Sequence, residues 1–414
     1  MRVLSIDMSI AFGLVLACPI GCDSNDNQTN YRTLTNPTGL GIVRRPEPYV
    51  FNRSPLQSLP SYNPASTDSF QVDVRSQDLS ALDLSGRSND LSFAVFDSKT
   101  VWPTALPADF LPSDLLEIGK NPGLGVRSLH DRGITGKGIG VAVIDQPLLV
   151  DHSEYADRVK CYEEIHWPAS DLFASMHGPA VASFAVGKTV GVASEADLYF
   201  IAEQHGTWSG STFAWDFTWL AQAIDRVLAI DALLPTESRI RVISISVGWA
   251  PNQKGYAEVT AAVARAVQAG IFVVSSSISD TFGYHIQGLG RSPLADPDHA
   301  ESYGPGSWWA DKYHAQGMPL GDDTLLAPMD SRTGASFTGN DDYFWGRVGG
   351  WSWTVPYIAG VYALACQVKP EITPDVFWTS ALNTAATITV TEAGTASPFG
   401  RILDPVKLMD ELSK

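Results

Sequence analysis

GKGIGVAVIDQ, residues 136–146, is a short apolar run that begins among glycines and runs into a carboxylate, Asp145. Its small and β-branched residues predict a buried strand over 139–145. Similar short runs predict three more strands, at 197–202, 241–247 and 270–275. Helical patterns alternate with them, at 179–186, 217–232, 257–269 and 352–368. This alternation predicts a three-layer α/β/α fold with a mostly parallel central sheet, whose functional residues gather at the carboxyl ends of strands.

Three local patterns occur in the order Asp, His, Ser. Asp145 ends the first strand, where a carboxylate can hold an imidazole in one tautomer. In MHGPAVASFAVG (176–187), His177 precedes a helix of small residues and is placed to act as a general base. In GGWSWTVPYIAGVYALA (349–365), Ser352 opens an apolar helix, so its hydroxyl and backbone N–H face the positive helix end. Taken singly, these residues are better explained as a turn former, a core histidine and a helix N-cap.

Together the three patterns resemble the subtilase family of serine peptidases, whose catalytic triad runs Asp, His, Ser. GWSWTVPYIAG follows the family pattern G-T-S-M-A-x-P-H-V-A-G at five positions, Gly350, Ser352, Pro356, Ala359 and Gly360. His152 and Glu154 match the H-P-D element of the family. The resemblance extends from Gly123 to the last helix and implies a subtilisin-like fold.

The resemblance implies a serine endopeptidase that forms an acyl-enzyme, with Asp145, His177 and Ser352 as its triad. It also implies that the backbone of Ser246, Val247 and Gly248 pairs with a peptide substrate. Two decoys compete with these residues. His205-Gly206-Thr207 copies the family's H-G-T more literally but lacks the helix, and Gly334-Ala335-Ser336 mimics G-T-S without a helix or a downstream proline.

The sequence departs from the family around the expected oxyanion hole. In GIFVVSSSISDT, Ser279 stands where the family usually has an asparagine side-chain donor. Trp351 and Trp353 flank the nucleophile where smaller residues are usual, which indicates a crowded pocket. These departures keep open an alternative, a weak or inactive pseudopeptidase that binds peptides or proteins.

The turn at 186–191 is shorter than in calcium-rich subtilases, so that calcium site is expected to be absent. No cofactor is required and no metal ligand is assigned, although calcium elsewhere stays open. The long segment 282–340 is expected to form elaborated loops around the cleft.

The N-terminal residues 1–22 combine one arginine with a short apolar run, as in an export segment. Val15-Leu16-Ala17-Cys18 resembles a lipobox, which predicts Cys18 as a lipidation site and an extracytoplasmic protein, either secreted or a cell-envelope lipoprotein. An ordinary signal peptide, or a buried segment of a cytoplasmic protein, is the alternative.

Residues 23–117 are predicted to be a low-complexity linker and N-terminal extension, and 118–414 the peptidase domain. Within the extension, 72–98 repeats Asp-Leu-Ser three times and is interpreted as an arm that docks its leucines on the main domain. A surface-anchored interaction lipoprotein, with this arm as its functional part, is a third hypothesis.

The formal net charge is −17, from 28 Lys and Arg against 45 Asp and Glu. Such a surface repels phosphates, so no nucleic-acid partner is expected, and the partner implied is a protein or peptide substrate. Nothing after the N-terminal segment reaches transmembrane length. Cys161 and Cys366 are interpreted as buried thiols, with a single disulfide as the alternative.

Overall fold

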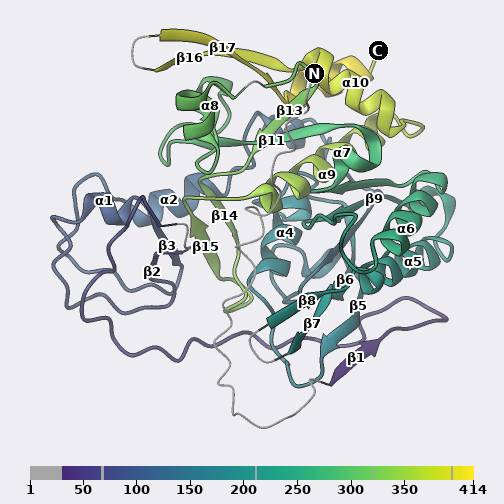
Figure 1. Ribbon diagram of the computed structural model, residues 1–414, viewed down its shortest axis with the longest axis horizontal. Coiled ribbons are helices and arrows are strands. Elements are labelled where there is room, and N and C mark those ends of the chain that lie inside the picture. The colour runs from purple at the N-terminus through teal and green to yellow at the C-terminus, as the bar shows by residue number, and fades with distance from the viewer. Residues whose placement is uncertain (1–29, 67–69, 210–211, 319, 393–394) are drawn as a thin grey trace.

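The computed structural model describes residues 30–66, 70–209, 212–318, 320–392 and 395–414 (Figure 1). The predicted export segment and Cys18 lie outside these residues. A six-stranded sheet forms the centre, in the order β1 (Tyr31–Leu34), β5 (Val159–Pro168), β6 (Asp197–Glu203), β4 (Gly140–Asp145), β9 (Ile240–Ile245) and β10 (Phe272–Ser275). The strands from β5 to β10 are parallel, and β1 is antiparallel to β5.

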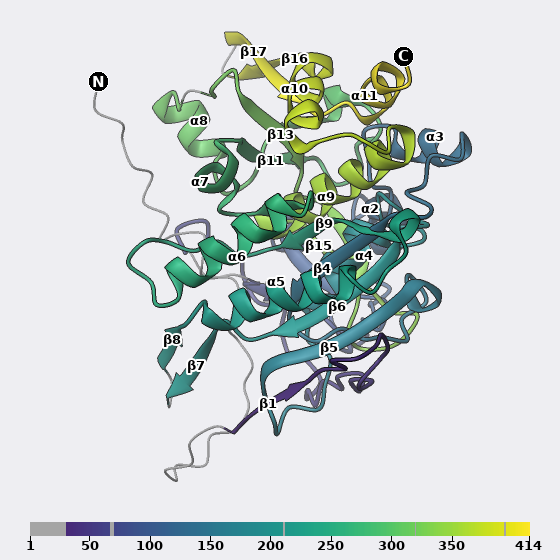
Figure 2. The same ribbon diagram turned by 90° about the vertical axis from the view of Figure 1, so that its right-hand side faces the viewer.

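Helices cover both faces of this sheet (Figures 1 and 2). Side chains alternate along β4, so Val141 and Val143 pack into one core cluster while Ala142 and Ile144 pack into another. The first cluster lies against α4 (His177–Val186) and α9 (Trp351–Val368), and the second against α5 (Thr218–Asp231) and α6 (Tyr256–Gln268). The prediction of a three-layer fold with a mostly parallel sheet is confirmed.

The segment expected to form loops around the cleft contains regular structure instead, and that expectation is wrong. It holds β11 (His285–Arg291), β12 (Tyr303–Pro305), α8 (Ala310–Gln316), β13 (Thr324–Pro328) and β14 (Arg332–Ala335). β11, β12 and β13 join β16 (Ala386–Glu392) and β17 (Thr395–Ile402) in a five-stranded sheet, ordered β12-β11-β13-β17-β16. The sequence analysis did not predict this sheet, whose two parts are joined by the long-range pairing of β13 with β17.

The N-terminal extension packs on the main domain. It contributes β2 (Val72–Asp73), α1 (Ser88–Leu91) and β3 (Ala94–Asp97), and β3 pairs with β15 (Tyr343–Gly346) in a four-stranded sheet ordered β14-β15-β3-β2. The leucines of the three Asp-Leu-Ser units, Leu79, Leu84 and Leu91, are buried in one cluster with Trp345. The structure differs from the expected linker at β1, because Arg32 and Arg44 hold this segment against a buried carboxylate, Glu164.

The remaining helices are short and peripheral: α2 (Pro112–Gly119), α3 (Val126–Asp131), α7 (Ile278–Phe282), α10 (Pro374–Thr384) and α11 (Pro405–Leu412). A hairpin of β7 (Gly206–Ser209) and β8 (Thr212–Trp215) stands apart from the sheets. Every helix in the described part of the chain is too short or too polar to cross a membrane.

Candidate active site

The carboxyl end of β4 brings Asp145 to the first residue of α4, His177. Asp145 Oδ1 and His177 Nδ1 lie 2.7 Å apart, and both side chains are buried. The backbone N–H of Gln146 also donates to Asp145 Oδ1, at 2.8 Å. Because a carboxylate only accepts, the proton of a neutral imidazole sits on Nδ1 and leaves Nε2 as the acceptor. This is the arrangement that a general base requires.

His177 is also fixed by an aromatic neighbour, Trp353. The two ring centroids are 5.4 Å apart with an interplanar angle of 29°, and Phe184 meets the indole edge-on at 5.0 Å. His177 Nε2 is buried and has no hydrogen-bond partner among the residues that the structure describes. The imidazole is thus oriented at Nδ1 and unengaged at Nε2.

Ser352 is the second residue of α9 and contacts the strand that was predicted to bind substrate. Its Oγ donates to the backbone oxygen of Ser246 over 3.4 Å, and Ser246 Oγ donates to the backbone oxygen of Ser352 at 3.1 Å. The Ser352 carbonyl is free to accept because Pro356, four residues on, has no N–H to give it. The proline of the motif therefore leaves a gap in the helical hydrogen bonding beside Ser352.

The predicted triad is thus only partly joined by hydrogen bonds. Asp145 and His177 are bonded directly, whereas Ser352 is bonded to Ser246 and, within the described residues, not to His177. Ser352 immediately precedes the indole that stacks on the imidazole. The three candidates therefore meet where β4, α4 and α9 converge.

Ser246, Val247 and Gly248 extend β9 beyond its last paired residue. The Val247 oxygen accepts from Ser276 N at 3.2 Å, and Trp249 N donates to Ser277 Oγ at 2.9 Å. A Cβ added to Gly248 would lie 3.1 Å from Ser277 Oγ, so the turn after β10 packs closely on this segment. That turn gives the substrate-strand candidates a fixed backbone.

Ser279, the predicted oxyanion donor, lies on α7, and its side chain is exposed. Ser277, the residue before the helix, is buried and bonds both the N–H and the carbonyl of Trp249. The family motif predicted Ser279 at this position, but it did not predict the helix that begins at Ile278. Its role as an oxyanion donor stays a prediction.

The decoy residues belong to other surroundings. His205 Nδ1 lies 3.1 Å from Glu203 Oε2, and its ring stacks on Phe217. Burial raises the pKa of the Glu203 carboxyl. Ser336 Oγ lies 2.9 Å from Thr338 Oγ1 in the loop after β14.

His152, from the element that resembles H-P-D, serves the local structure. Its Nδ1 accepts from Glu154 N and its Nε2 lies 2.8 Å from the Asp342 oxygen, while burial lowers the pKa of the ring. The Glu154 carboxylate accepts from Thr189 and Tyr343. In the described part of the chain, no group of three or more His, Cys, Asp or Glu side chains is placed to hold a metal ion.

Sequence reasoning missed two contributors to this site, the Ser246 hydroxyl and the Trp353 ring. Pro356 was a usable signal for the first, because it leaves the Ser352 carbonyl without a helical partner. Trp353 was read as crowding the pocket, but it is buried against His177.

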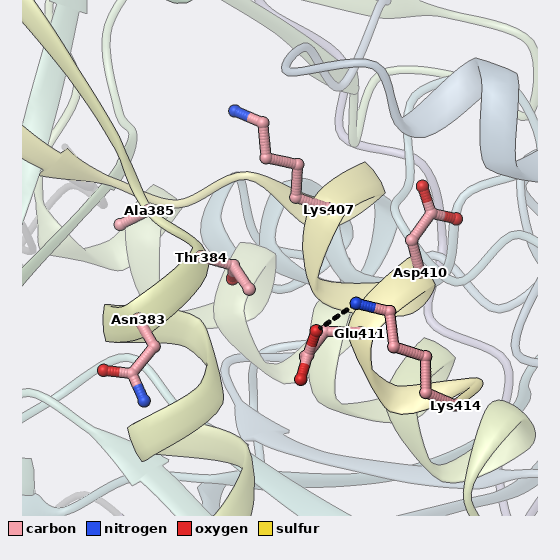
Figure 3. Close-up of a pocket in the computed structure, with 7 residues that line it drawn as sticks. All are labelled: Asn383, Thr384, Ala385, Lys407, Asp410, Glu411 and Lys414. Atoms are coloured by element: carbon pink, nitrogen blue, oxygen red, sulfur yellow. Dashed lines mark hydrogen bonds and ion pairs between the residues drawn. The ribbon is translucent and has the colours of Figure 1, made fainter.

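A surface pocket near the C-terminus shares no residue with this site. It lies between α10 and α11 and is lined by Asn383, Thr384, Ala385, Lys407, Asp410, Glu411 and Lys414 (Figure 3). Its charges are mostly paired locally; for example, Lys414 Nζ lies 2.7 Å from Glu411 Oε2. The pocket is therefore a separate feature of the surface.

Comparison with known proteins gives a family match. Residues 136–307 match the model of the subtilase family, a range that includes Asp145, His177 and the 246–248 segment and ends before Ser352. An extracellular serine proteinase of Thermus sp. (strain Rt41A) is 26% identical over 268 residues, which cover 64% of this chain and 59% of that relative. The match thus spans less than two thirds of that relative's length.

Two solved structures were also found to be similar. The prenylagaramide maturation protease PagA has 17% identity and a TM-score of 0.47, covering 70% of this chain and 99% of the other. A protease from Pseudoalteromonas arctica PAMC 21717 has 19% identity and a TM-score of 0.48, covering 73% and 98%. The family match over residues 136–307 and the proteinase relative thus both indicate that this part of the chain is similar to the subtilase family.

Proposed function

We propose that the chain is a serine endopeptidase that hydrolyses peptide bonds through an acyl-enzyme intermediate, with Ser352, His177 and Asp145 as its triad. The observation that carries this proposal is the 2.7 Å contact between Asp145 and His177 beside a serine at a helix N-terminus. The subtilase family match over residues 136–307 and the serine proteinase relative support the same activity. The implied partner is a protein or peptide, bound as an added strand along 246–248.

In the first half of the reaction, Ser352 Oγ leaves the Ser246 carbonyl and attacks the scissile carbonyl carbon. His177 Nε2 takes the hydroxyl proton and then gives it to the leaving amine, so that the C–N bond breaks and an ester remains on Ser352. Asp145 stabilises the imidazolium that forms in between. In the second half, water attacks the ester with His177 again as the base, and the acid product is released.

The oxyanion would be held by the Ser352 backbone N–H at the start of α9, where helix amides lack internal partners. Ser279 remains the candidate for the second donor. Ser279→Ala tests it: a fall in kcat with little change in KM supports the role, and an unchanged kcat shows that the donor lies elsewhere.

The triad is tested with a fluorophosphonate probe and a peptide substrate. Asp145→Asn should lower kcat by about 10⁴-fold and Ser352→Ala and His177→Ala by about 10⁶-fold, and Ser352→Ala should abolish labelling. The decoys supply matched controls, because His205→Ala and Ser336→Ala should keep labelling and most of the activity. Loss of labelling in Ser336→Ala with retention in Ser352→Ala would overturn the assignment.

A pseudopeptidase is the second candidate, favoured by two observations. Ser352 is bonded to Ser246 rather than to His177, and two tryptophans flank it. If folded wild-type protein takes up no probe but binds peptides, with binding weakened by changes at 246–248, this candidate replaces the enzyme.

We also propose export, in line with the apolar segment 1–22 and with the relative's name, an extracellular proteinase. Lipidation would occur at Cys18. Incorporation of a labelled fatty acid that persists in Cys18→Ala would refute Cys18 as the lipidation site, and secretion would still be decided by a fractionation test.

A further inference from the structure

We infer that residues 30–53, here named the N-terminal clasp, are a permanent part of the folded protein and position the loop that leads into His177. Maturation would therefore remove nothing beyond the start of the clasp. The retention of the clasp stands independently of activity. Its effect on catalysis rests on the proposed function.

The first anchor of the clasp is a buried carboxylate on β5. Glu164 has a fully buried side chain, with Arg32 Nε at 2.5 Å and Arg44 at 2.6 Å. Its other partner is the Tyr162 hydroxyl, at 2.8 Å. A buried charge that loses its counter-ions is strongly unfavourable, so removal of the clasp would leave Glu164 without a cation.

The second anchor is the adjacent carboxylate, Glu163, which is also fully buried. It accepts from the backbone N–H of Asn36 at 2.9 Å and from two nitrogens of Arg226 at 2.7 and 2.8 Å. Arg226 in turn donates to the backbone oxygen of Asn36 at 2.6 Å. Neighbouring side chains on a strand point to opposite faces. The clasp therefore bonds to buried carboxylates on both faces of β5.

The third anchor reaches the loop before His177. Glu47 N donates to the Leu172 oxygen at 3.0 Å, and Ala174 N donates to the Glu47 oxygen at 2.8 Å. Tyr49 N donates to the Phe337 oxygen at 2.9 Å, and the two rings stack at 5.3 Å.

A small apolar cluster extends this contact to both catalytic loops. Met176, next to His177, packs with Tyr49 on a core that includes Leu149, which follows Asp145 by four positions. The clasp therefore touches the segment after the candidate Asp and the segment before the candidate His. Its loss would loosen both.

A removable propeptide must leave behind a surface that water tolerates. Departure of the clasp would expose the edge of β5, strip the cations from Glu164 and uncover the aromatic cluster around Phe337. Each of these changes would destabilise the protein that remains after cleavage. The geometry therefore favours retention.

The first test is a mass measurement that needs no activity. Folded protein from its native host is purified by size, denatured, digested and quantified by mass spectrometry. Peptides containing Arg32 and Arg44 should be equimolar with the peptide containing Ser352. Folded protein that lacks them would overturn the inference.

The second test asks whether the clasp positions His177. The value of kcat is calculated per titrated active site, so that a smaller amount of folded protein does not lower it. Tyr49→Ala breaks the aromatic contact without touching a buried charge, and should lower kcat about fivefold while KM changes less than twofold. Tyr49→Phe should restore the rate, because the ring is kept. Arg132→Met is a matched control, since both it and its ion-pair partner Asp410 are exposed and, in the described part of the chain, neither is bonded to the clasp, and it should leave kcat unchanged. An unchanged kcat in Tyr49→Ala would refute the positioning role.

Discussion

The pair formed by Ser246 and Ser352 makes a prediction that a double-mutant cycle can measure. Ser246 Oγ donates to the Ser352 carbonyl at 3.1 Å, and that carbonyl lacks a helical donor only because residue 356 is proline. Ser246→Ala should therefore cost about 1 kcal/mol of unfolding free energy, the net value of one hydrogen bond. Both serines are half-buried, so water can replace part of the loss and the lower half of the usual range applies.

Pro356→Ala changes this cost, because alanine supplies the N–H that bonds the carbonyl four residues earlier. In that background Ser246→Ala should cost about 0.5 kcal/mol less, which appears in the cycle as coupling between the two sites. The other effects of removing the proline, on chain entropy and helix shape, cancel in the difference.

The assay is denaturant unfolding of the wild type, both single variants and the double variant, with kcat/KM for a peptide substrate measured alongside. Ser244→Ala is the matched control: it removes a hydroxyl two residues earlier on β9 that has no partner among the described residues, and it should be close to neutral. Additive effects of Ser246→Ala and Pro356→Ala would refute the idea that the proline frees the carbonyl for Ser246.

Three further predictions concern stability and rate. Trp353→Met removes the indole face from the imidazolium that forms on His177 and should lower kcat about fivefold, as expected for about 1 kcal/mol of cation–π stabilisation; an equal kcat contradicts this. Burial lowers the pKa of His152 below 6.5, so the unfolded chain binds a proton first and stability falls as pH drops through 6.5; unfolding at pH 7.5 and 5.5 should show a smaller drop in His152→Gln than in the wild type. Arg332 is buried with no hydrogen-bond partner for its guanidinium within the described residues, and burial lowers its pKa to about 10, so Arg332→Met should cost little or raise Tm. Arg291→Met should cost more by about 1–2 kcal/mol, because that guanidinium donates to the Ala295 carbonyl of its own loop and to the Ser331 carbonyl; equal Tm changes would contradict the comparison.

Local sequence predicted those parts of the fold in which apolar residues occupy buried positions. β4 is buried on both faces and is apolar up to Asp145, and α9 is apolar along most of its length, so both were found within one or two residues. β5 was missed because two carboxylates interrupt its apolar run. Those charges are stable inside only through arginines supplied from elsewhere in the chain, which no local window contains.

The candidate site divides in the same way. The meeting of Asp145 and His177 follows from parallel topology, which gathers strand ends at one edge, and it was predictable. The exposure of Ser279 was not, because the buried cap Ser277 starts a helix that motif matching does not register. The bond between Ser246 and Ser352 depends on two segments that meet only in the folded state.

The four-stranded sheet β14-β15-β3-β2 has a consequence for how the protein is made. It joins β2 and β3 of the N-terminal extension to β14 and β15, which are made much later, and Ser98 bonds Asp342 across 244 residues of sequence. While the ribosome is still producing the middle of the chain, β2 and β3 can pair only with each other, and β3 lacks its second partner, β15. Contacts of such long range also slow folding. Completion of this sheet is therefore a late event in biosynthesis, because β3 cannot pair with β15 until most of the chain has been translated.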